Sequence, residues 1–406
     1  MNTWSQIAHD VLGTPLELPC GAQFRNRMAK SAMSDSLGDG AGNPTGAQAR
    51  LYERWAHGGA AVSMVGEVQV TAHFPEKPGN LVLGPHSDRA ALRALARRAT
   101  AGGAHLWPQL GHAGALAHPP ISAPMGPSAL DLPGLRCEGL SASEVESLPG
   151  MYAEAAVIAK EAGFSGVHLH AGHGFLLSQF LSPLFNRRTD KYGGSIEARV
   201  TIVLAIIAEV RRRVGPGFPI GIRINATDKL QGGLTETDAL EVVRLLEGTT
   251  IDLIDISGGT YFPGAKASSD GVADEGPYFL EFAKRAKALT NVPLMLTGGF
   301  RTRSQAVEAL SSGAADMVGL ARAMALDPQL ANAWLSEEGG DPAFPTFAAP
   351  PPGGITAWYS MRLTALGEDR EDAFALDPGA ALGAYDARDE QRCERWLAQF
   401  GRRTSV

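Results

Sequence analysis

Two histidines, His170 and His173, stand three residues apart in a segment that reads HLHAGH, directly after a short apolar run. Imidazole N–H groups at this spacing can donate hydrogen bonds to a substrate oxygen, and two histidines after a strand can also bind zinc. A zinc site would need further histidine, lysine or aspartate ligands nearby. Because the later apolar runs end in Arg223, Ser257 and glycines, we favour substrate binding, assign no metal ligand, and treat His168 as structural.

Polar residues or glycines also follow the other apolar runs of the chain, which is not expected of runs that only close a scaffold. They are Ser34, Glu67, Gln109, Arg223, Ser257 with Gly258 and Gly259, Gly298 with Gly299, and Ala321 with Arg322. Two glycines after a run can simply form a tight turn. After the last two runs of a barrel, however, backbone N–H groups and a short helix N-terminus often bind a phosphate, and Arg322 would add a charge-assisted contact.

The apolar runs have the length of parallel strands, and amphipathic segments separate them. Each run is apolar on both faces, as expected when helices cover one side and a packed barrel interior covers the other. Because there are eight such units, the pattern predicts an α/β fold of the (β/α)₈ TIM-barrel class, whose catalytic groups lie at the C-terminal ends of the strands. The predicted strands are 27–33, 60–66, 104–110, 166–170, 219–224, 250–256, 292–297 and 315–320.

Several predicted helices carry start and stop signals. Ser143-x-x-Glu146 and Thr235-x-x-Asp238 have the spacing of capping boxes, and Gly163 and Gly313 fit helix stops. No G-x-G-x-x-G follows a strand, which argues against a doubly wound dinucleotide-binding fold.

The segments outside the repeat predict one barrel with additions. The Pro- and Gly-rich stretch from Gly111 to Ser141 predicts an extended loop after the third strand. A second Pro- and Gly-rich stretch precedes a predicted helix over 356–367. We therefore expect a single barrel domain over 1–338 and a C-terminal extension over 339–406 that packs on or near it.

Composition excludes several classes of protein. The net charge of -7 and the absence of a basic cluster argue against nucleic-acid binding. No stretch approaches the roughly 18 apolar residues of a membrane span, and the first ten residues lack signal-peptide character. We therefore expect a cytoplasmic protein with a small-molecule substrate and no membrane or nucleic-acid partner. An acidic barrel of this size is compatible with a monomer or a homo-oligomer.

Several stretches together resemble the Old Yellow Enzyme family of FMN-dependent ene-reductases and NADH oxidases, over about residues 16–378. No single stretch would suffice for this resemblance. They are residues 25–33, RLYERWA at 50–56, QLGHAG at 109–114, residues 163–183 followed by NRRTD at 186–190 and YGGS at 192–195, ISGGT at 256–260, and VGLAR at 318–322.

This resemblance implies an FMN-dependent oxidoreductase with NADH or NADPH as the transient hydride donor. It implies that Gln109 meets the pyrimidine edge of the flavin, that Arg223 lies by N1 and O2, and that Ser34 tunes the flavin near O4. A carboxylate at Glu67 could repel an electron-rich flavin or restrict substrates. The residues implied in FMN binding are Ala32, Met33, Ser34, Glu67, Gln109, Arg223, Gly298, Gly299, Ala321 and Arg322.

The resemblance also implies a substrate pocket, in which His170 and His173 donate to a carbonyl or nitro oxygen. Ser34, Glu67, Phe175 and Tyr261 are the other implied members of the pocket. The chain departs from the family at Phe175, where the family carries a proton-donating tyrosine, because a phenyl ring cannot donate a proton. Tyr261, and Tyr359 or Trp358 in the C-terminal helix, are candidates to reach over the site.

The leading hypothesis is therefore hydride transfer from NAD(P)H through the flavin to an activated alkene, a quinone or a similar electrophile, with weakened turnover of ordinary enones. A second hypothesis keeps FMN but makes the enzyme a desaturase or isomerase of a carbonyl compound, which needs no tyrosine donor. The third hypothesis is a metal-dependent barrel hydrolase, and the fourth is a barrel that binds a ligand without catalysis.

Overall fold

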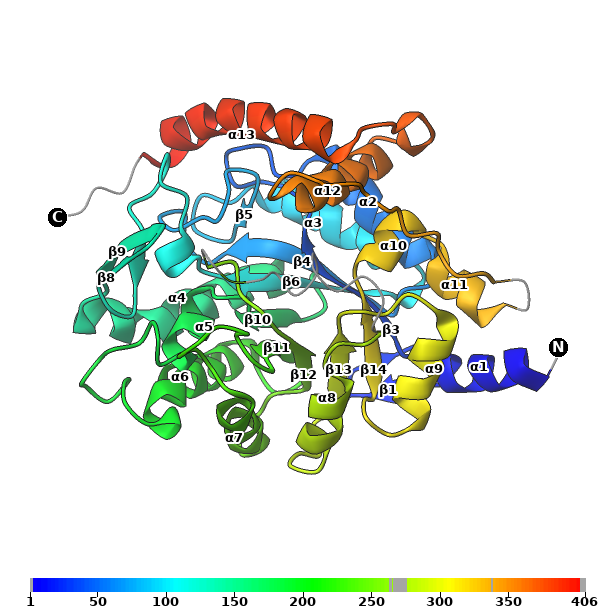
Figure 1. Ribbon diagram of the computed structural model, residues 1–406, viewed down its shortest axis with the longest axis horizontal. Helices are drawn as coiled ribbons and strands as arrows, with labels where there is room; N and C mark the ends of the chain where they lie inside the picture. Colours follow the sequence, from blue (N-terminus) through cyan, green and yellow to red (C-terminus); the bar gives the residue numbers. More distant parts are fainter. Residues whose placement is uncertain (1–2, 263–264, 266–275, 337–338, 402–406) are drawn as a thin grey trace.

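The computed structural model describes residues 3–262, 265, 276–336 and 339–401, and its centre is a closed barrel of eight parallel strands (Figure 1). Each strand pairs with its neighbours in parallel, and the first barrel strand pairs with both the second and the last. The TIM-barrel prediction is confirmed, and every predicted strand overlaps an observed one. The barrel strands are β3 (Met28–Ser34), β4 (Val62–Gln69), β6 (His105–Gly111), β10 (Val167–Ala171), β11 (Ile220–Asn225), β12 (Leu253–Ser257), β13 (Leu294–Thr297) and β14 (Met317–Leu320).

Helices cover the outside of the barrel and connect successive strands (Figure 1). α1 precedes the barrel, and α5, α10 and α11 are short additions after β10 and β14. The helices are α1 (Thr3–Gly13), α2 (Gly46–His57), α3 (Arg89–Ala99), α4 (Ala142–Glu161), α5 (Leu176–Leu181), α6 (Ile196–Val214), α7 (Glu236–Glu247), α8 (Leu280–Lys287), α9 (Arg303–Ser311), α10 (Arg322–Leu326) and α11 (Leu330–Leu335).

Helix ends follow local side-chain chemistry. Thr235 caps α7 by accepting from the Asp238 N–H, which confirms the predicted cap but not the reciprocal half of the predicted capping box. The box predicted at Ser143 is wrong by two residues, because Ser141 caps α4 and forms a capping box with Glu144. Gly163 lies two residues after the end of α4, and its N–H donates to the Lys160 carbonyl. Its φ of 89° is a backbone conformation that a side chain would disfavour.

The barrel interior divides into an apolar lower half and a polar upper half. Side chains of alternate residues point inward along a strand, so each strand contributes to successive layers. A two-stranded hairpin, β1 (Leu16–Glu17) and β2 (Gln23–Phe24), adds apolar residues to the lower half. The lower layer is formed by Leu16, Leu18, Phe24, Ala29, Val62, Met64, Trp107, Leu253, Met295 and Met317. Most of the next inward positions toward the C-terminal ends are polar, and they form the base of the site.

The segment after β6 is more ordered than the sequence indicates. The predicted extended loop over 111–141 instead contains the short helix η2 (Gly114–Leu116) and a three-stranded sheet. Its strands are β7 (Met125–Gly126), β8 (Leu130–Leu132) and β9 (Leu135–Gly139). They are too short to show a recognisable alternation of apolar and polar residues in the sequence. β5 (Leu81–Val82) is a further edge strand on β4, and η1 (Ala101–Gly103) follows α3.

The C-terminal part returns across the top of the barrel (Figure 1). α12 (Gly354–Gly367) packs against α2 and α13, and confirms the helix predicted over 356–367. The short turn η3 (Glu371–Ala373) leads to α13 (Pro378–Phe400), which the sequence did not predict. No helix among the described residues is both long enough and apolar enough to cross a bilayer.

We expect Trp396 to hold α13 on the barrel. Its ring is fully buried with Val82 and Ile121, and its indole N–H donates to the Ala72 carbonyl at 3.3 Å. Trp396→Ala should lower the unfolding free energy by about 3–5 kcal/mol and expose α13 to trypsin. Thermal unfolding and limited proteolysis check this, with Trp4→Ala as the control because Trp4 is 45% exposed. Equal effects of the two substitutions would contradict the prediction.

Candidate active site

The C-terminal ends of the barrel strands meet at one mouth, and the predicted site residues lie on these ends or directly after them. This follows from the parallel order of the strands, which brings all eight ends to the same side. Ser34 ends β3, Glu67 and Gln109 lie near the ends of β4 and β6, and His170 and Arg223 lie near the ends of β10 and β11. The glycine pairs and Arg322 follow β12, β13 and β14.

A buried cation forms the base of this mouth. Arg223 is 2% exposed, and its Nε donates to Asp255 Oδ2 at 2.7 Å while a terminal nitrogen donates to Ser31 Oγ. Thr297 Oγ1 donates to the other oxygen of Asp255 at 2.7 Å and lies 3.1 Å from Ser31 Oγ. Four strands thus hold the guanidinium in one orientation. Burial raises the pKa of Asp255, and Arg223 opposes that shift.

The residues that hold Arg223 were missed by the sequence analysis. Asp255 and Ser31 lie within apolar strands, and their inward orientation emerges once the neighbouring strands are paired. Asp255 could have been found from the sequence, because it is a charged residue inside an otherwise apolar run. A buried carboxylate requires a partner, so its presence there indicates a buried cation nearby.

His168 and Gln109 extend the same polar layer. Gln109 Nε2 donates to His168 Nδ1 at 3.0 Å, and His168 Nε2 lies 3.6 Å from Asp255 Oδ2. Burial and the charge of Arg223 lower the pKa of His168 well below its usual value. The neutral ring therefore connects the end of β6 to the buried ion pair.

His170 presents a ring N–H without a hydrogen-bond partner. Its Nδ1 accepts from the Gly172 N–H at 3.3 Å, so in the neutral ring the proton lies on Nε2. Nε2 is buried and lies 3.4 Å from Glu67 Oε1 without forming a hydrogen bond. Burial and Arg223 lower the pKa of His170 well below its usual value, so the ring is a neutral donor at neutral pH.

His173 is fixed in a left-handed backbone conformation with φ 59°. Its N–H donates to Asn225 Oδ1 at 2.9 Å, and its carbonyl accepts from the Tyr261 N–H at 3.0 Å. Its ring Nε2 is hydrogen-bonded to Ser257 Oγ at 2.9 Å. Backbone strain of this kind persists where the surroundings over-determine it, often at functional sites. Asn225 also donates to Asp228 at 2.9 Å, and sequence reasoning missed its role.

An aromatic group lies beside the histidines. Phe175 is 1% exposed, its ring centroid lies 5.0 Å from that of His170, and it packs with Phe74 in an apolar cluster. The Tyr261 ring lies 5.8 Å from the ring of His173 and 5.9 Å from that of Phe175. Tyr261 therefore lies at the site, as the sequence analysis considered.

Glu67 adds a carboxyl group that is neutral over much of the physiological range. Burial raises its pKa to about 8, and the charge of Arg223 opposes this rise. Burial, followed by the charge of Glu67, raises the pKa of Glu76 to about 8 as well.

The ends of β13 and β14 form a glycine-lined corner. Gly298 and Gly299 have φ 115° and 86°, and a Cβ on Gly299 would lie 2.0 Å from the Gly276 carbonyl oxygen. Ala321 is the N-cap of α10, whose first residue is Arg322. The backbone can therefore approach a ligand here more closely than a side chain would allow.

The C-terminal extension covers this corner. The guanidinium of Arg322 lies 4.9 Å from the centre of the Tyr359 ring, and Ser360 Oγ donates to the Ser34 carbonyl at 3.2 Å. Trp358 packs instead on Phe374 and donates to the Leu376 carbonyl, so its indole N–H is engaged within the extension. Tyr359, and not Trp358, reaches the mouth. Burial raises the pKa of Tyr359, and the charges of Arg322 and of Arg301, which the sequence analysis missed, oppose this rise.

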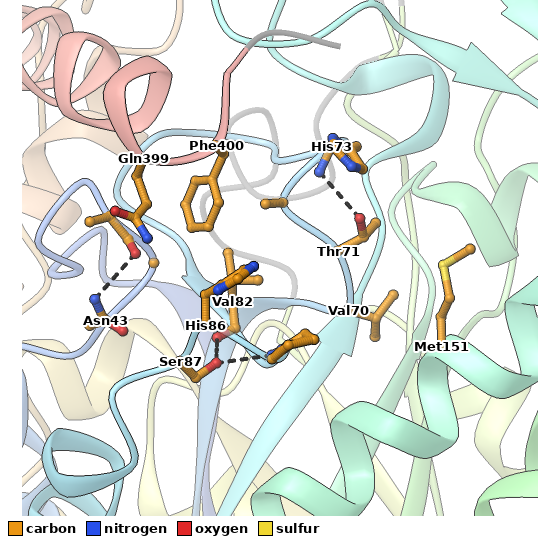
Figure 2. Close-up of a pocket in the computed structure, with 15 residues that line it drawn as sticks. Asn43, Val70, Thr71, His73, Val82, His86, Ser87, Met151, Gln399 and Phe400 are labelled. Carbon is orange, nitrogen blue, oxygen red and sulfur yellow. Dashed lines mark hydrogen bonds between the residues drawn. The ribbon is translucent and has the colours of Figure 1, made fainter.

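A separate cavity of about 320 Å³ lies outside the mouth (Figure 2). It is lined by the segment after β4, including Thr71 and His73, and by Gln399 and Phe400 at the end of α13. None of the predicted site residues lines it. Within the described chain, His, Cys, Asp and Glu side chains form no group of three that could hold a metal ion.

The C-terminal mouth of the barrel thus combines a buried arginine, a histidine pair and a glycine-lined corner, at the place where barrels of this class bind cofactors. Residues 12–336 match the model of the NADH:flavin oxidoreductase / NADH oxidase family. The chain belongs to this family, which makes it an FMN-dependent oxidoreductase that takes hydride from a nicotinamide nucleotide. The family resemblance and the FMN prediction are confirmed.

Curated relatives agree with this membership. The NADH-dependent flavin oxidoreductase iliE of Hypocrea jecorina (strain QM6a) is 33% identical over 348 residues, which cover 78% of this chain and 86% of the relative. The NADH oxidase of Thermoanaerobacter brockii is 30% identical over 314 residues, but the match covers 48% of its length. The chain therefore spans about half of some of its relatives.

Solved structures share the fold. A 2-naphthoyl-CoA reductase in complex with 2-naphthoyl-CoA has a TM-score of 0.75 and 26% identity, with 80% of this chain and 52% of that one covered. Morphinone reductase has a TM-score of 0.70 and 23% identity, and the match covers 82% of this chain and 91% of morphinone reductase.

The donor set of the mouth fits FMN. Two of the buried polar atoms that have no hydrogen-bond partner in the described structure, Ser34 Oγ and His170 Nε2, lie at strand ends of this mouth. The glycine-lined corner beside Arg322 suits a phosphate, and the fixed cation Arg223 suits an electron-rich ring.

Glu67 should make stability fall as the pH rises. Between its usual pKa of 4.5 and about 8, the unfolded chain has lost the proton that the folded chain keeps, so the unfolding free energy decreases through this window. In Glu67→Gln, the unfolding free energy measured with urea should therefore decrease less steeply across this window. Glu390→Gln, at an exposed residue of α13, is the control. Parallel curves for wild type and Glu67→Gln would contradict this account of Glu67.

Proposed function

We propose that the protein transfers hydride from NADH or NADPH, through FMN, to a small electrophilic acceptor such as an activated alkene or a quinone. The observation that carries this proposal is the partnerless N–H of His170, a neutral donor buried at the mouth. A donor of this kind stabilises negative charge that develops on an acceptor oxygen, which is the charge that hydride addition creates.

The residues proposed to hold FMN come from the ends of the strands. Gly298, Gly299, Ala321 and Arg322 would bind the phosphate, and Arg223 would sit by the pyrimidine ring. Ala32, Met33, Ser34, Glu67 and Gln109 would complete the flavin contacts. FMN held there would supply the chemistry of hydride transfer between the nicotinamide and the acceptor.

His170 and His173 are proposed to orient the acceptor. His170 offers Nε2–H, while His173 Nε2 is engaged by Ser257, which leaves Nδ1 of His173 to meet an acceptor oxygen. Both rings are neutral because burial lowers the pKa of each well below its usual value. Ser34, Glu67, Phe175 and Tyr261 would form the rest of the pocket, and the apolar packing of Phe175 favours an acceptor with an apolar body.

A second candidate function is FMN-dependent desaturation or isomerisation of a carbonyl compound. Glu67 favours it, because its pKa of about 8 is suited to a general base near neutral pH, and it lies beside the His170 ring. Incubating the oxidised protein with a saturated ketone or an unsaturated isomer, under anaerobic conditions without NAD(P)H, distinguishes the functions. New product would favour this candidate.

We predict that the purified protein shows visible flavin absorption that bleaches on anaerobic addition of NADH or NADPH. Subsequent addition of a quinone should restore the bands. A colourless protein that takes up no added FMN would contradict the cofactor assignment, and bands that neither nucleotide bleaches would contradict the proposed hydride donor.

We also predict that His170→Ala slows reoxidation of the reduced protein by acceptors about 100-fold, the scale expected for removing one oxyanion donor. Stopped-flow measurement after chemical reduction isolates this step. His86→Ala, at an exposed site outside the mouth, should leave it unchanged. An unaltered rate for His170→Ala would remove His170 from the proposed role.

A further inference from the structure

Tyr261 has a position that its neighbours fix. Thr260 and Phe262 on either side are buried, and Phe262 stacks on Phe185 with ring centroids 3.7 Å apart. The Tyr261 N–H donates to the His173 carbonyl. Tyr261 itself is 55% exposed. The backbone is therefore anchored on both sides of a phenol that stays accessible at the mouth.

The phenol ring of Tyr261 lies beside the rings of His173 and Phe175. Phe175 contacts the ring of His170 but carries no hydroxyl, whereas Tyr261 contacts the rings of both His173 and Phe175. Among the groups near the histidines, the imidazoles are assigned to the acceptor oxygen. A second group is needed to protonate carbon, because one donor cannot hold the oxygen and reach the α-carbon together.

A phenol with its ordinary pKa of about 10 is protonated at neutral pH, and the surroundings of Tyr261 raise that pKa further. The surrounding protein and the carboxyls of Glu76 and Glu67 raise the pKa of Tyr261, while Arg322 and Arg223 act in the opposite direction. Its hydroxyl therefore retains a proton to donate at neutral pH.

We propose that Tyr261 is the general acid that protonates the α-carbon of an alkene acceptor. The inference rests on the proposed function. Hydride supplied by NADH adds to the β-carbon, and the π electrons of the C=C bond move to an enolate whose oxygen His170 holds. The O–H bond of Tyr261 then breaks, its proton forms the new C–H bond at the α-carbon, and the phenolate regains a proton from water.

The test compares two acceptors on the FMN-loaded enzyme. A 2-methyl-substituted cyclic enone needs a proton on carbon, and that proton sets the configuration of its α-carbon. Benzoquinone needs protons on oxygen alone, which water can supply. The variants are Tyr261→Phe, Tyr261→Phe with Phe175→Tyr, and Tyr192→Phe as a control that removes a phenol hydroxyl in the segment before α6.

We expect Tyr261→Phe to reduce the enone about 100-fold more slowly, the scale of general acid catalysis, and to give mixed configuration at the α-carbon. Quinone reduction should persist. The double variant should recover the enone rate, because it restores a phenol beside His170, and Tyr192→Phe should behave as wild type.

Three results would overturn the inference. An unchanged enone rate with unchanged configuration, or an equal loss with both acceptors, would exclude Tyr261 as the acid while leaving the proposed function in place. A wild-type enzyme that NADH reduces but no alkene reoxidises would instead refute the alkene part of the proposed function, and this inference with it.

Discussion

The charge of Arg223, enclosed within a barrel, is the constraint on which the site depends. A buried guanidinium requires a partner, and removing one partner of such a pair costs about 3–5 kcal/mol. Asp255 supplies the countercharge from the adjacent strand, and Ser31 and Thr297 complete the hydrogen bonds from two others. The upper half of the barrel is therefore polar where the lower half is apolar. A rigid cation beneath the mouth is the result.

Burial at the mouth shifts the pKa values of its histidines and of its carboxyl group in opposite directions, and both shifts favour the uncharged form. It lowers the pKa of His170 and His173 and raises that of Glu67. The histidines thus donate as uncharged rings, and Glu67 lies beside His170 without forming an ion pair at neutral pH. Charge inside the mouth is concentrated at its base and at the Arg322 corner. This separation suits a ligand with a phosphate at one end and an electron-rich ring at the other.

Sequence reasoning succeeded where the signal was local and repeated. Each barrel strand is a short apolar run, so eight of them predicted the architecture, and the parallel order predicted which ends would meet. The sequence analysis did not predict α13, because its buried residues are only Ala381, Asp389 and Trp396, which are too few to form an apolar stripe. The roles of Asp255 and Asn225 were not predicted, because a polar residue within an apolar strand meets its hydrogen-bond partners only once the strands are paired. The position of Tyr261 depends on backbone contacts with His173 that no spacing in the sequence reveals.

The pairing of β3 with β14 joins Met28 to Val318, from opposite ends of the barrel sequence. Ser31 lies on β3, and Thr297 precedes β14, so the shell around Arg223 is completed by the last closing step. Until β14 is available, the guanidinium and the Asp255 carboxylate remain in a half-open sheet that water can enter. Enclosing them therefore depends on strand pairings of high contact order, and a chain growing on the ribosome can complete these pairings only after nearly the whole barrel has been synthesised.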